Sequence, residues 1–299
     1  MSISNSKKTS KFDSWVLASR PHTLPAAVMP VIVGTALAHF ENSLKPLAAL
    51  VALLCSLLIQ IGTNYANDLY DFLSGADKED RTGPVRALAS GLITVAEMKI
   101  GMAVVFGSAF LLGMYLVYLG GIPILIIGVL SILAGIAYTA GPYPLAYNGL
   151  GDVFVFLFFG FVGTVGTFYV QTLKFTSLAI WASIPVGALI TNILVVNNYR
   201  DTDEDKAAGK NTTAVIFGKR FARMQYIIFM ILSYLTPFIV YLVYKQDFWI
   251  FLPLLTFPLA VKLIKMIYSL EGVYLNRTLE LTAKLSALYG FLFAFGIVL

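Results

Sequence analysis

Long apolar runs follow one another along the whole chain, separated by short polar segments. Each run has about 20 residues, the length that an α-helix needs to cross the hydrocarbon core of a bilayer. Nine spans are predicted, at 23–40, 46–66, 96–118, 122–140, 152–171, 177–198, 223–244, 248–268 and 279–299. The pattern therefore predicts an all-α membrane protein with nine transmembrane helices, forming a single domain over residues 1–299.

The composition agrees with this prediction. The chain is 58% hydrophobic and 12% charged, with a mean hydropathy of +0.81, whereas a soluble domain has about 25% charged residues. Residues 1–11 are polar and lack the apolar stretch of a cleavable signal peptide. Cys55 is the single cysteine, which excludes a disulfide within the chain and predicts a packing role.

Lysine and arginine are sorted by predicted membrane side. With residues 1–19 as a cytoplasmic N-terminal segment, seventeen lie on that side and three on the other, while Lys284 falls inside the last span. This bias predicts that the N-terminus is cytoplasmic, and nine spans then place the C-terminus outside. Because the basic residues follow the membrane sides, the net charge of +5 does not indicate a nucleic-acid partner.

Two acidic clusters directly follow apolar runs. The first covers 64–71 and continues through Asp77, Glu79 and Asp80, and the second covers 197–205; together they hold nine of the sixteen carboxylates. Carboxylates at membrane helix ends are costly unless they face water, a partner or a metal. The clusters end the second and sixth spans, which suggests two four-helix halves plus a ninth helix around a central cavity open to the cytoplasm.

The oxygen-bearing residues of each cluster recur at helical intervals, so they share a helix face. The intervals are i, i+4 and i+7 for Asn64, Asp68 and Asp71, and i, i+3 and i+7 for Asn198, Asp201 and Asp205. No His or Cys lies nearby, which disfavours zinc. Oxygen ligands alone suit Mg²⁺, which shares its coordination shell with waters and substrate phosphates.

Basic residues are interleaved with these acids. They are Lys78, Arg81, Arg86, Arg200, Lys206 and Lys210. Carboxylates beside such cations fit a diphosphate held partly by metal ions and partly by Arg or Lys. With apolar walls, the substrate would be a lipid diphosphate whose allylic cation is stabilised by aromatic faces in a dry cavity. The alternative is a pair of solvated loops with ordinary cytoplasmic charges.

A third feature is the cytoplasmic segment 138–152, which is rich in Gly, Pro and Tyr and has no Lys or Arg. A flat aromatic acceptor needs apolar and aromatic walls with few polar groups. Tyr138 and Tyr143 are the candidates for such a wall. The alternative is a tight turn between two helices.

From about Arg20 to the C-terminus, the chain resembles the UbiA-type superfamily of intramembrane aromatic prenyltransferases. The first motif that carries the resemblance is Asn67-Asp68-Leu69-Tyr70-Asp71, then Gly75, Asp77, Asp80-Arg81, Gly83-Pro84 and Arg86. The second is Asn197-Asn198-Tyr199-Arg200-Asp201, with Asp205, Gly209, Lys210 and Thr212. Many members have an acid where this chain has Gly75.

The resemblance implies a nine-helix fold, a central cavity and two Mg²⁺ ions bound through the paired motifs. It implies that the catalytic, metal-binding acids are Asp68, Asp71, Asp201 and Asp205, with Asp77 as a further metal ligand. Substrate binding would then fall to Asn67, Lys78, Arg81, Arg86, Asn198, Arg200 and Lys210.

The segment Arg20-Pro21-His22-Thr23-Leu24, the Gly-Pro-Tyr-Pro loop and Gly75 followed by Asp77 resemble the 1,4-dihydroxy-2-naphthoate branch of the superfamily. That branch implies transfer of a polyprenyl group from its diphosphate to the naphthoate with loss of the carboxylate, which gives a demethylmenaquinone. Alternatives are another acceptor (4-hydroxybenzoate, homogentisate, haem or chlorophyllide) or a phytyl donor. A secondary transporter is the alternative from another class. Prenyl chain length and oligomeric state stay open.

Overall fold

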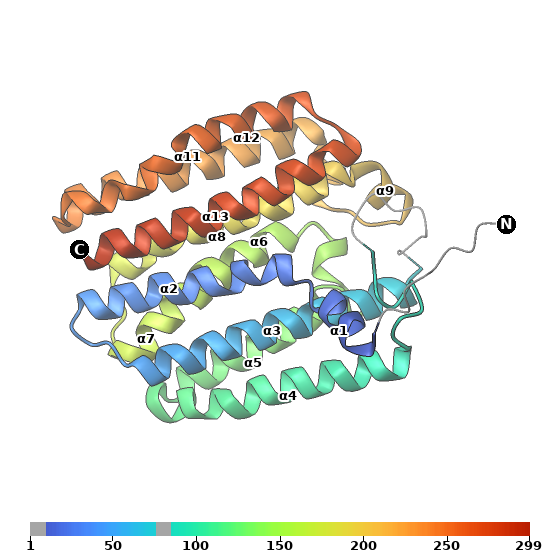
Figure 1. Ribbon diagram of the computed structural model, residues 1–299, viewed down its shortest axis with the longest axis horizontal. Helices are drawn as coiled ribbons and strands as arrows, with labels where there is room; N and C mark the ends of the chain where they lie inside the picture. The colour runs from blue at the N-terminus through green and yellow to red at the C-terminus, as the bar shows by residue number, and fades with distance from the viewer. Residues whose placement is uncertain (1–9, 76–84) are drawn as a thin grey trace.

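The structure, a computed structural model, describes residues 10–75 and 85–299. Its long helices lie side by side in one bundle (Figure 1). Within the described residues, nine apolar helical segments coincide with the predicted spans, and eight of them are long and apolar enough to cross a membrane, the first when taken from Lys11 to Phe40. They are α2 (Leu24–Phe40), α3 (Pro46–Leu73), α4 (Val95–Gly120), α5 (Ile122–Ala137), the continuous α6 (Gly151–Val155), η3 (Phe156–Val165) and α7 (Gly166–Thr172), α8 (Ser177–Arg200), α11 (Lys219–Tyr244), η4 (Phe248–Thr256) with α12 (Phe257–Ser269), and α13 (Leu275–Val298).

Short helices connect these segments. They are α1 (Lys11–Ser19), η1 (Pro21–Thr23), η2 (Leu145–Tyr147), α9 (Thr202–Ala207), α10 (Thr213–Phe217) and η5 (Gly272–Tyr274). The first acidic cluster lies largely within α3, which continues to Leu73, and the second begins in the last turn of α8. The apolar pattern placed these helix ends too early because it stops at the first polar residues, whereas the helices continue through them.

The packing order supports the idea of two similar halves. The second and third helices of each half pack along one another, α3 on α4 and α8 on α11. The ninth helix, α13, packs against both α2 and α8. It therefore joins the halves on one side, and both acidic clusters come to the same end of the bundle (Figure 1).

Glycines allow one close helix crossing in the centre of the bundle. The segment η3 is wound as a π-helix, and a Cβ on its Gly160 would lie 3.0 Å from the Cα of Gly187 in α8. The two backbones therefore touch, as small residues permit in membrane helices. This contact fixes η3 against α8, and other residues of both elements line the cavity described below.

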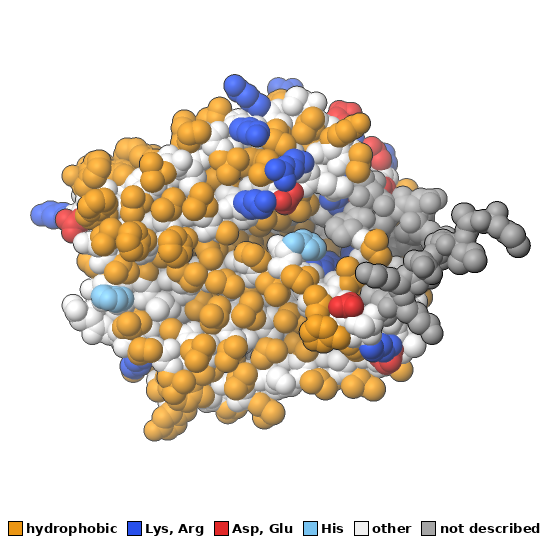
Figure 2. All heavy atoms as spheres, in the orientation of Figure 1, with side chains coloured by type: hydrophobic (Ala, Val, Ile, Leu, Met, Phe, Trp, Pro, Cys, Tyr) orange, Lys and Arg blue, Asp and Glu red, His pale blue; other side chains and the backbone are white. Residues whose placement is uncertain are grey.

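Hydrophobic side chains cover most of the visible face of the bundle (Figure 2). Only 17% of the apolar window of α4 is buried inside the protein, so this helix presents most of its surface outward. Such a continuous apolar exterior is stable only in lipid. The chain is an integral, multi-pass membrane protein.

Candidate active site

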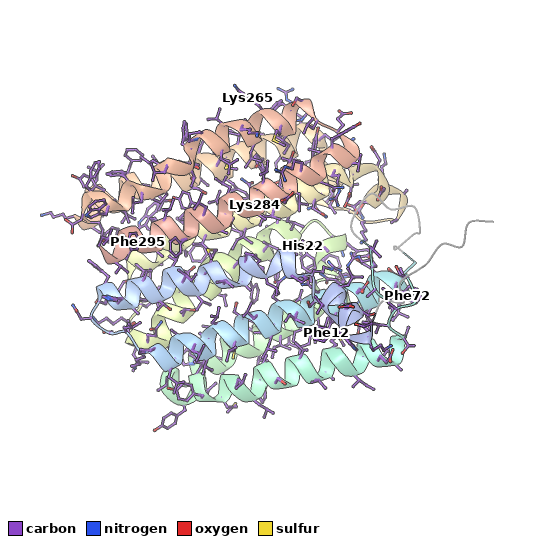
Figure 3. All side chains as sticks on the ribbon, viewed as in Figure 1. Phe12, His22, Phe72, Lys265, Lys284 and Phe295 are labelled. Carbon is purple, nitrogen blue, oxygen red and sulfur yellow. The ribbon has the colours of Figure 1, made fainter. Side chains whose placement is uncertain are left out.

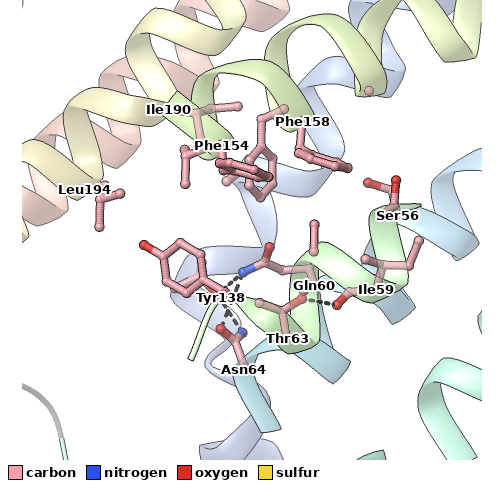
Figure 4. A pocket seen from close by; sticks show the side chains of 18 of the residues that line it. Ser56, Ile59, Gln60, Thr63, Asn64, Tyr138, Phe154, Phe158, Ile190 and Leu194 are labelled. Atoms are coloured by element: carbon pink, nitrogen blue, oxygen red, sulfur yellow. Dashed lines mark hydrogen bonds between the residues drawn. The ribbon is translucent and has the colours of Figure 1, made fainter. Parts of the chain in front are cut away.

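A cavity of about 1170 Å³ lies between the two halves and is lined by helices of both, together with α13. Its deeper part is lined by apolar and aromatic side chains, among them Phe154, Phe158 and Ile190 (Figure 4). Asn67, Asp71, Arg86, Asn198, Arg200, Asp201, Asp205 and Lys210 line the cavity too. The structure thus brings the described parts of both acidic motifs to one cavity, whereas Asp77, Lys78 and Arg81 lie outside the described residues.

Asp71 is the common acceptor of three groups from separate segments. Its side chain is 4% exposed and accepts from Arg86 Nη2 at 3.1 Å, Lys210 Nζ at 3.0 Å and Tyr147 Oη at 2.7 Å. The Lys210 ammonium also lies 4.7 Å from the centroid of the Tyr147 ring. Lys210 thereby connects the two motifs, and Tyr147 is a site residue that the sequence did not single out.

Asp68 lies behind the cavity lining. It is 1% exposed and accepts the backbone N–H of Leu88 at 3.4 Å, so it anchors the segment that carries Arg86. At 100° per residue, Asp68 is about 100° round α3 from Asn67, which does line the cavity. The predicted role of Asp68 as a metal ligand receives no support from this position, because the lining face of the helix is the one with Asn67 and Asp71.

The amides of α3 hold neighbouring segments. Asn64 donates to Ser19 O at 2.9 Å and to Thr23 Oγ1 at 3.0 Å, which ties α3 to the chain around η1. Gln60, one turn earlier, also donates to Asn64 at 3.4 Å (Figure 4). Asn67 accepts from Thr139 Oγ1 at 3.0 Å and so contacts the segment after α5. These partners satisfy the amides that the sequence places near a membrane helix end.

Arg200 and Asp201 form a buried ion pair at the end of α8. Arg200 donates from Nε and Nη2 to the two Asp201 oxygens, each at 2.6 Å. It also donates to Asn276 of α13 at 2.6 Å and to Asn197 at 2.8 Å. Arg200 is thus held in place by α8 and α13 at the cavity lining.

Asp152 is a buried acid that the sequence did not single out. It receives Asn198 Nδ2 at 3.2 Å, Gln225 Nε2 at 3.0 Å and the Thr213 hydroxyl. Asn198, predicted to bind substrate, therefore turns its amide nitrogen toward this acid. A carboxylate in the first turn of an apolar helix was the signal that could have found it.

Asp205 lies on α9, half-buried at the cavity. Burial raises the pKa of its carboxyl to about 7; Lys210 lowers the pKa, while Asp201, Asp71 and Glu204 raise it further. Acids of both motifs therefore act on the same carboxyl group. Such crowding of negative charge is expected where a cation is to be bound.

The two tyrosines predicted for the acceptor wall lie in different surroundings. Tyr138 lines the cavity, and its hydroxyl would be 3.1 Å from a Cβ at Gly151. Burial, and then the charges of nearby carboxylates, raise the pKa of Tyr138, which keeps the phenol protonated. Tyr143 is 60% exposed and is absent from the described cavity lining, so its predicted role is corrected. It lies between Pro142 and Pro144, and the sequence could not show which way this turn faces.

The donor set fits Mg²⁺ by its chemistry. The cavity presents carboxylate and amide oxygens of Asn67, Asp71, Asp201 and Asp205. Within residues 10–75 and 85–299, no three His, Cys, Asp or Glu side chains are gathered into one metal-binding group. Ligands distributed in this way suit ions that complete their shells with water and substrate phosphate.

Comparison with known proteins confirms the predicted superfamily. Residues 27–288 match the UbiA prenyltransferase family. The chain is 37% identical to a 1,4-dihydroxy-2-naphthoate octaprenyltransferase of Escherichia coli (strain K12), over 98% of this chain and 97% of that protein. It is 34% identical to the protein of that name from Haemophilus influenzae, over 97% of each chain.

Solved structures share the fold. A UbiA homologue from Archaeoglobus fulgidus bound to DMAPP and Mg²⁺ has a TM-score of 0.68 at 17% identity, covering 95% of this chain and 99% of that one. An apo homologue from Aeropyrum pernix K1 has a TM-score of 0.70 at 12% identity, covering 89% and 95%. From its fold, its paired motifs and these relatives, the chain belongs to the UbiA prenyltransferase family.

Proposed function

We propose that this protein transfers a polyprenyl group from an allylic diphosphate to 1,4-dihydroxy-2-naphthoate, with loss of the carboxylate, to give a demethylmenaquinol, the reduced form of a demethylmenaquinone. The observation that carries the proposal is that Asp71, Asp201 and Asp205 lie with their cations at one large, mainly apolar cavity. The naphthoate as acceptor rests on the names of the relatives reported above. The lysine and arginine bias supports an active site that faces the cytoplasm.

The arrangement of the cations supports a diphosphate site beside the acidic motifs. Arg86 and Lys210 both contact Asp71, and Arg200 contacts Asp201, so guanidinium and ammonium groups lie next to the proposed metal ligands. Arg and Lys would bind the diphosphate oxygens that the metal leaves unbound. Two Mg²⁺ ions, one for each motif, would bind the remaining diphosphate oxygens. When bound, they would neutralise the charge of the leaving diphosphate.

The apolar part of the cavity suits the rest of the reaction. Aromatic rings, including Phe154 and Phe158, line it and can stabilise an allylic cation while water is excluded. The C–O bond to the diphosphate breaks, a C–C bond to the naphthalene ring forms, and the carboxylate leaves as CO₂. Charge balances with inorganic diphosphate as the other product, and no net proton is taken up or released.

Product analysis tests this function. The purified full-length chain in detergent, with Mg²⁺ and one prenyl diphosphate, is offered equal concentrations of 1,4-dihydroxy-2-naphthoate and 4-hydroxybenzoate. We expect mass spectrometry to find mostly the decarboxylated, prenylated naphthalenediol. A pool dominated by prenylated hydroxybenzoate would overturn the acceptor assignment. An enzyme needs no gradient and should form product in detergent, whereas a transporter should form none. Absence of any prenylated product would therefore contradict the proposed reaction and favour the transporter alternative.

Replacement of Tyr138 by Ala is expected to raise KM for the naphthoate about fivefold, because an aromatic contact contributes roughly 1 kcal/mol. KM for the prenyl diphosphate should change little. Tyr143→Ala is the matched control: it makes the same substitution five residues away on an exposed side chain, and it should behave as the wild type. Steady-state kinetics with each substrate varied in turn measures both. Equal effects of the two substitutions would contradict this assignment.

A further inference from the structure

Helix α13 presents polar residues to the cavity, and one of them, Lys284, lies within the predicted last span. Asn276, Glu280 and Lys284 recur every four residues, so they share one helix face, and all three line the cavity. Lysine within a transmembrane helix is costly and indicates a functional site with a specific partner. Lys284 and His22 lie on the same visible face of the bundle (Figure 3).

The charges on this face leave one cation in excess. The Glu280 carboxylate accepts from Arg277 Nη1 at 2.7 Å and from Lys284 Nζ at 2.7 Å, so three charged groups sum to +1. Lys284 has 62% of its side chain exposed. In the described part of the chain, the Lys284 ammonium donates to Glu280, and an ammonium has three protons to donate. Lys284 can therefore take a second anionic partner.

This cation lies apart from those assigned to the diphosphate. Asn276, on the same face of α13, contacts Arg200, and Lys284 follows eight residues later. At 1.5 Å per residue that is about 12 Å along the helix axis, although the lysine side chain leans back toward Asn276. The cavity thus has two cationic regions, one at the acidic motifs and one partway down α13.

The two proposed substrates carry two separate anionic groups. The prenyl diphosphate is assigned above to Arg86, Arg200 and Lys210, so the carboxylate of the aromatic acid needs a further cation. Among the residues that the structure describes, two other cations line the cavity, Arg20 before η1 and Lys284 on α13. We propose that Lys284 binds this carboxylate, exchanging Glu280 for it, while Arg277 keeps Glu280 paired. The inference rests on the proposed function, and it assigns to Lys284 the selection of acceptors that carry a carboxylate.

Binding measurements test the inference without turnover. Calorimetry on the purified full-length protein in detergent would compare 1-hydroxy-2-naphthoate with 1-naphthol, which lacks the carboxylate. We expect Lys284→Gln to weaken hydroxynaphthoate binding about tenfold or more, since a hydrogen bond between charged groups is lost, and to leave naphthol binding unchanged. Lys265→Gln is the control, because it removes the same charge from an exposed position on α12 outside the described lining.

A second variant separates ligand binding from a structural role. Glu280→Gln removes the competing carboxylate and should tighten hydroxynaphthoate binding, which is the opposite effect to Lys284→Gln. Lys284→Arg keeps the positive charge, so it should retain part of the hydroxynaphthoate affinity that Lys284→Gln loses. Loss of binding in both variants, or equal loss for naphthol, would show that the ion pair merely supports α13 and overturn the inference. Unchanged binding in Lys284→Gln would overturn it as well. Failure of the proposed function appears separately, as absence of prenylated product from a wild type that binds hydroxynaphthoate.

Discussion

Replacing either Asp71 or Asp201 by Ala is expected to lower kcat at least about 100-fold, which is the usual cost of removing one preorganised electrostatic group from an active site. Both acids are buried at the cavity, and each holds cations assigned to the diphosphate. Loss of Asp71 removes one partner of Arg86 and of Lys210, besides removing a proposed metal ligand. Single-turnover measurements with saturating substrates separate this loss of chemistry from slow product release.

Asp203 provides the control within the same motif. Its side chain is 87% exposed and pairs with Lys219, away from the cavity. Asp203→Ala should therefore keep kcat within about twofold of the wild type, because exposed ion pairs contribute little. If Asp71→Ala or Asp201→Ala keeps more than about a tenth of wild-type kcat, a barrier change of about 1.4 kcal/mol, that residue is not a principal ligand.

Removal of divalent metal is expected to abolish turnover, with recovery when Mg²⁺ is added back. The leaving diphosphate carries several charges in a mainly apolar cavity, and the lysine and arginines beside the motifs are already paired with carboxylates. Without metal, those cations alone cannot neutralise both the acids and the diphosphate. Assay after treatment with EDTA and titration with Mg²⁺ measures the effect, and full activity after EDTA would contradict the proposed site.

The Mg²⁺ requirement should also depend on pH. The pKa of Asp205 is raised from 3.8 to about 7, so between these values the folded protein holds a proton that the unfolded chain has lost. The contribution of this group to stability is therefore present below about pH 4 and is lost as the pH rises through 7. Cation binding needs the carboxylate, so Mg²⁺ affinity should rise up to about pH 7 and then level off.

Mg²⁺ titrations at pH 6 and pH 8 measure this dependence. The wild type should need about ten times more Mg²⁺ at pH 6 than at pH 8, as expected for one ionisation with a pKa near 7. Asp205→Asn should lose the pH dependence, whereas Asp203→Asn should keep it. The same Mg²⁺ requirement at both pH values in the wild type would rule out Asp205 as the titrating ligand.

The fold was largely predictable because a bilayer imposes one length and one polarity on each helix. Apolar runs of this length are expected to form helices in a bilayer, where backbone groups must be hydrogen-bonded within the protein. Pro and Gly marked several of the connections between them. Helix ends were less predictable, since α3 and α8 continue through polar residues that face a cavity instead of water. Hydropathy measures the preference of a residue for lipid, and it does not register a polar surface inside the protein.

The site was predictable to the level of motifs and less so to the level of single side chains. Asp71, Asp201, Asp205 and Lys210 line the cavity, as the spacing of acids and bases suggested. Asp68 has nearly the same periodicity, yet it faces the segment around Leu88. Neighbouring positions on a helix differ by 100°, so small differences in helix rotation decide which acid reaches the cavity.

Tyr143 and Tyr147 show the same limit in a loop. Only the folded turn decides that Tyr147 donates to Asp71 while Tyr143 is exposed. Asp152 was overlooked for a related reason, because its partners Asn198, Thr213 and Gln225 are 46 to 73 residues distant in the sequence. Contacts over such distances leave no local pattern.

The pairing of Asp71 and Asp201 with bases means that these acids must exchange partners when the site fills. Lys210 and Arg86 pair with Asp71, and Arg200 pairs with Asp201, so these two acids are neutralised in a medium of low polarity before substrate enters. When a metal–diphosphate complex enters, the acids can pass to the metal and the bases to the phosphates. Diphosphate without its metal finds the bases already engaged. We therefore expect the ion pairs to favour binding of the donor together with its metal over binding of the diphosphate alone.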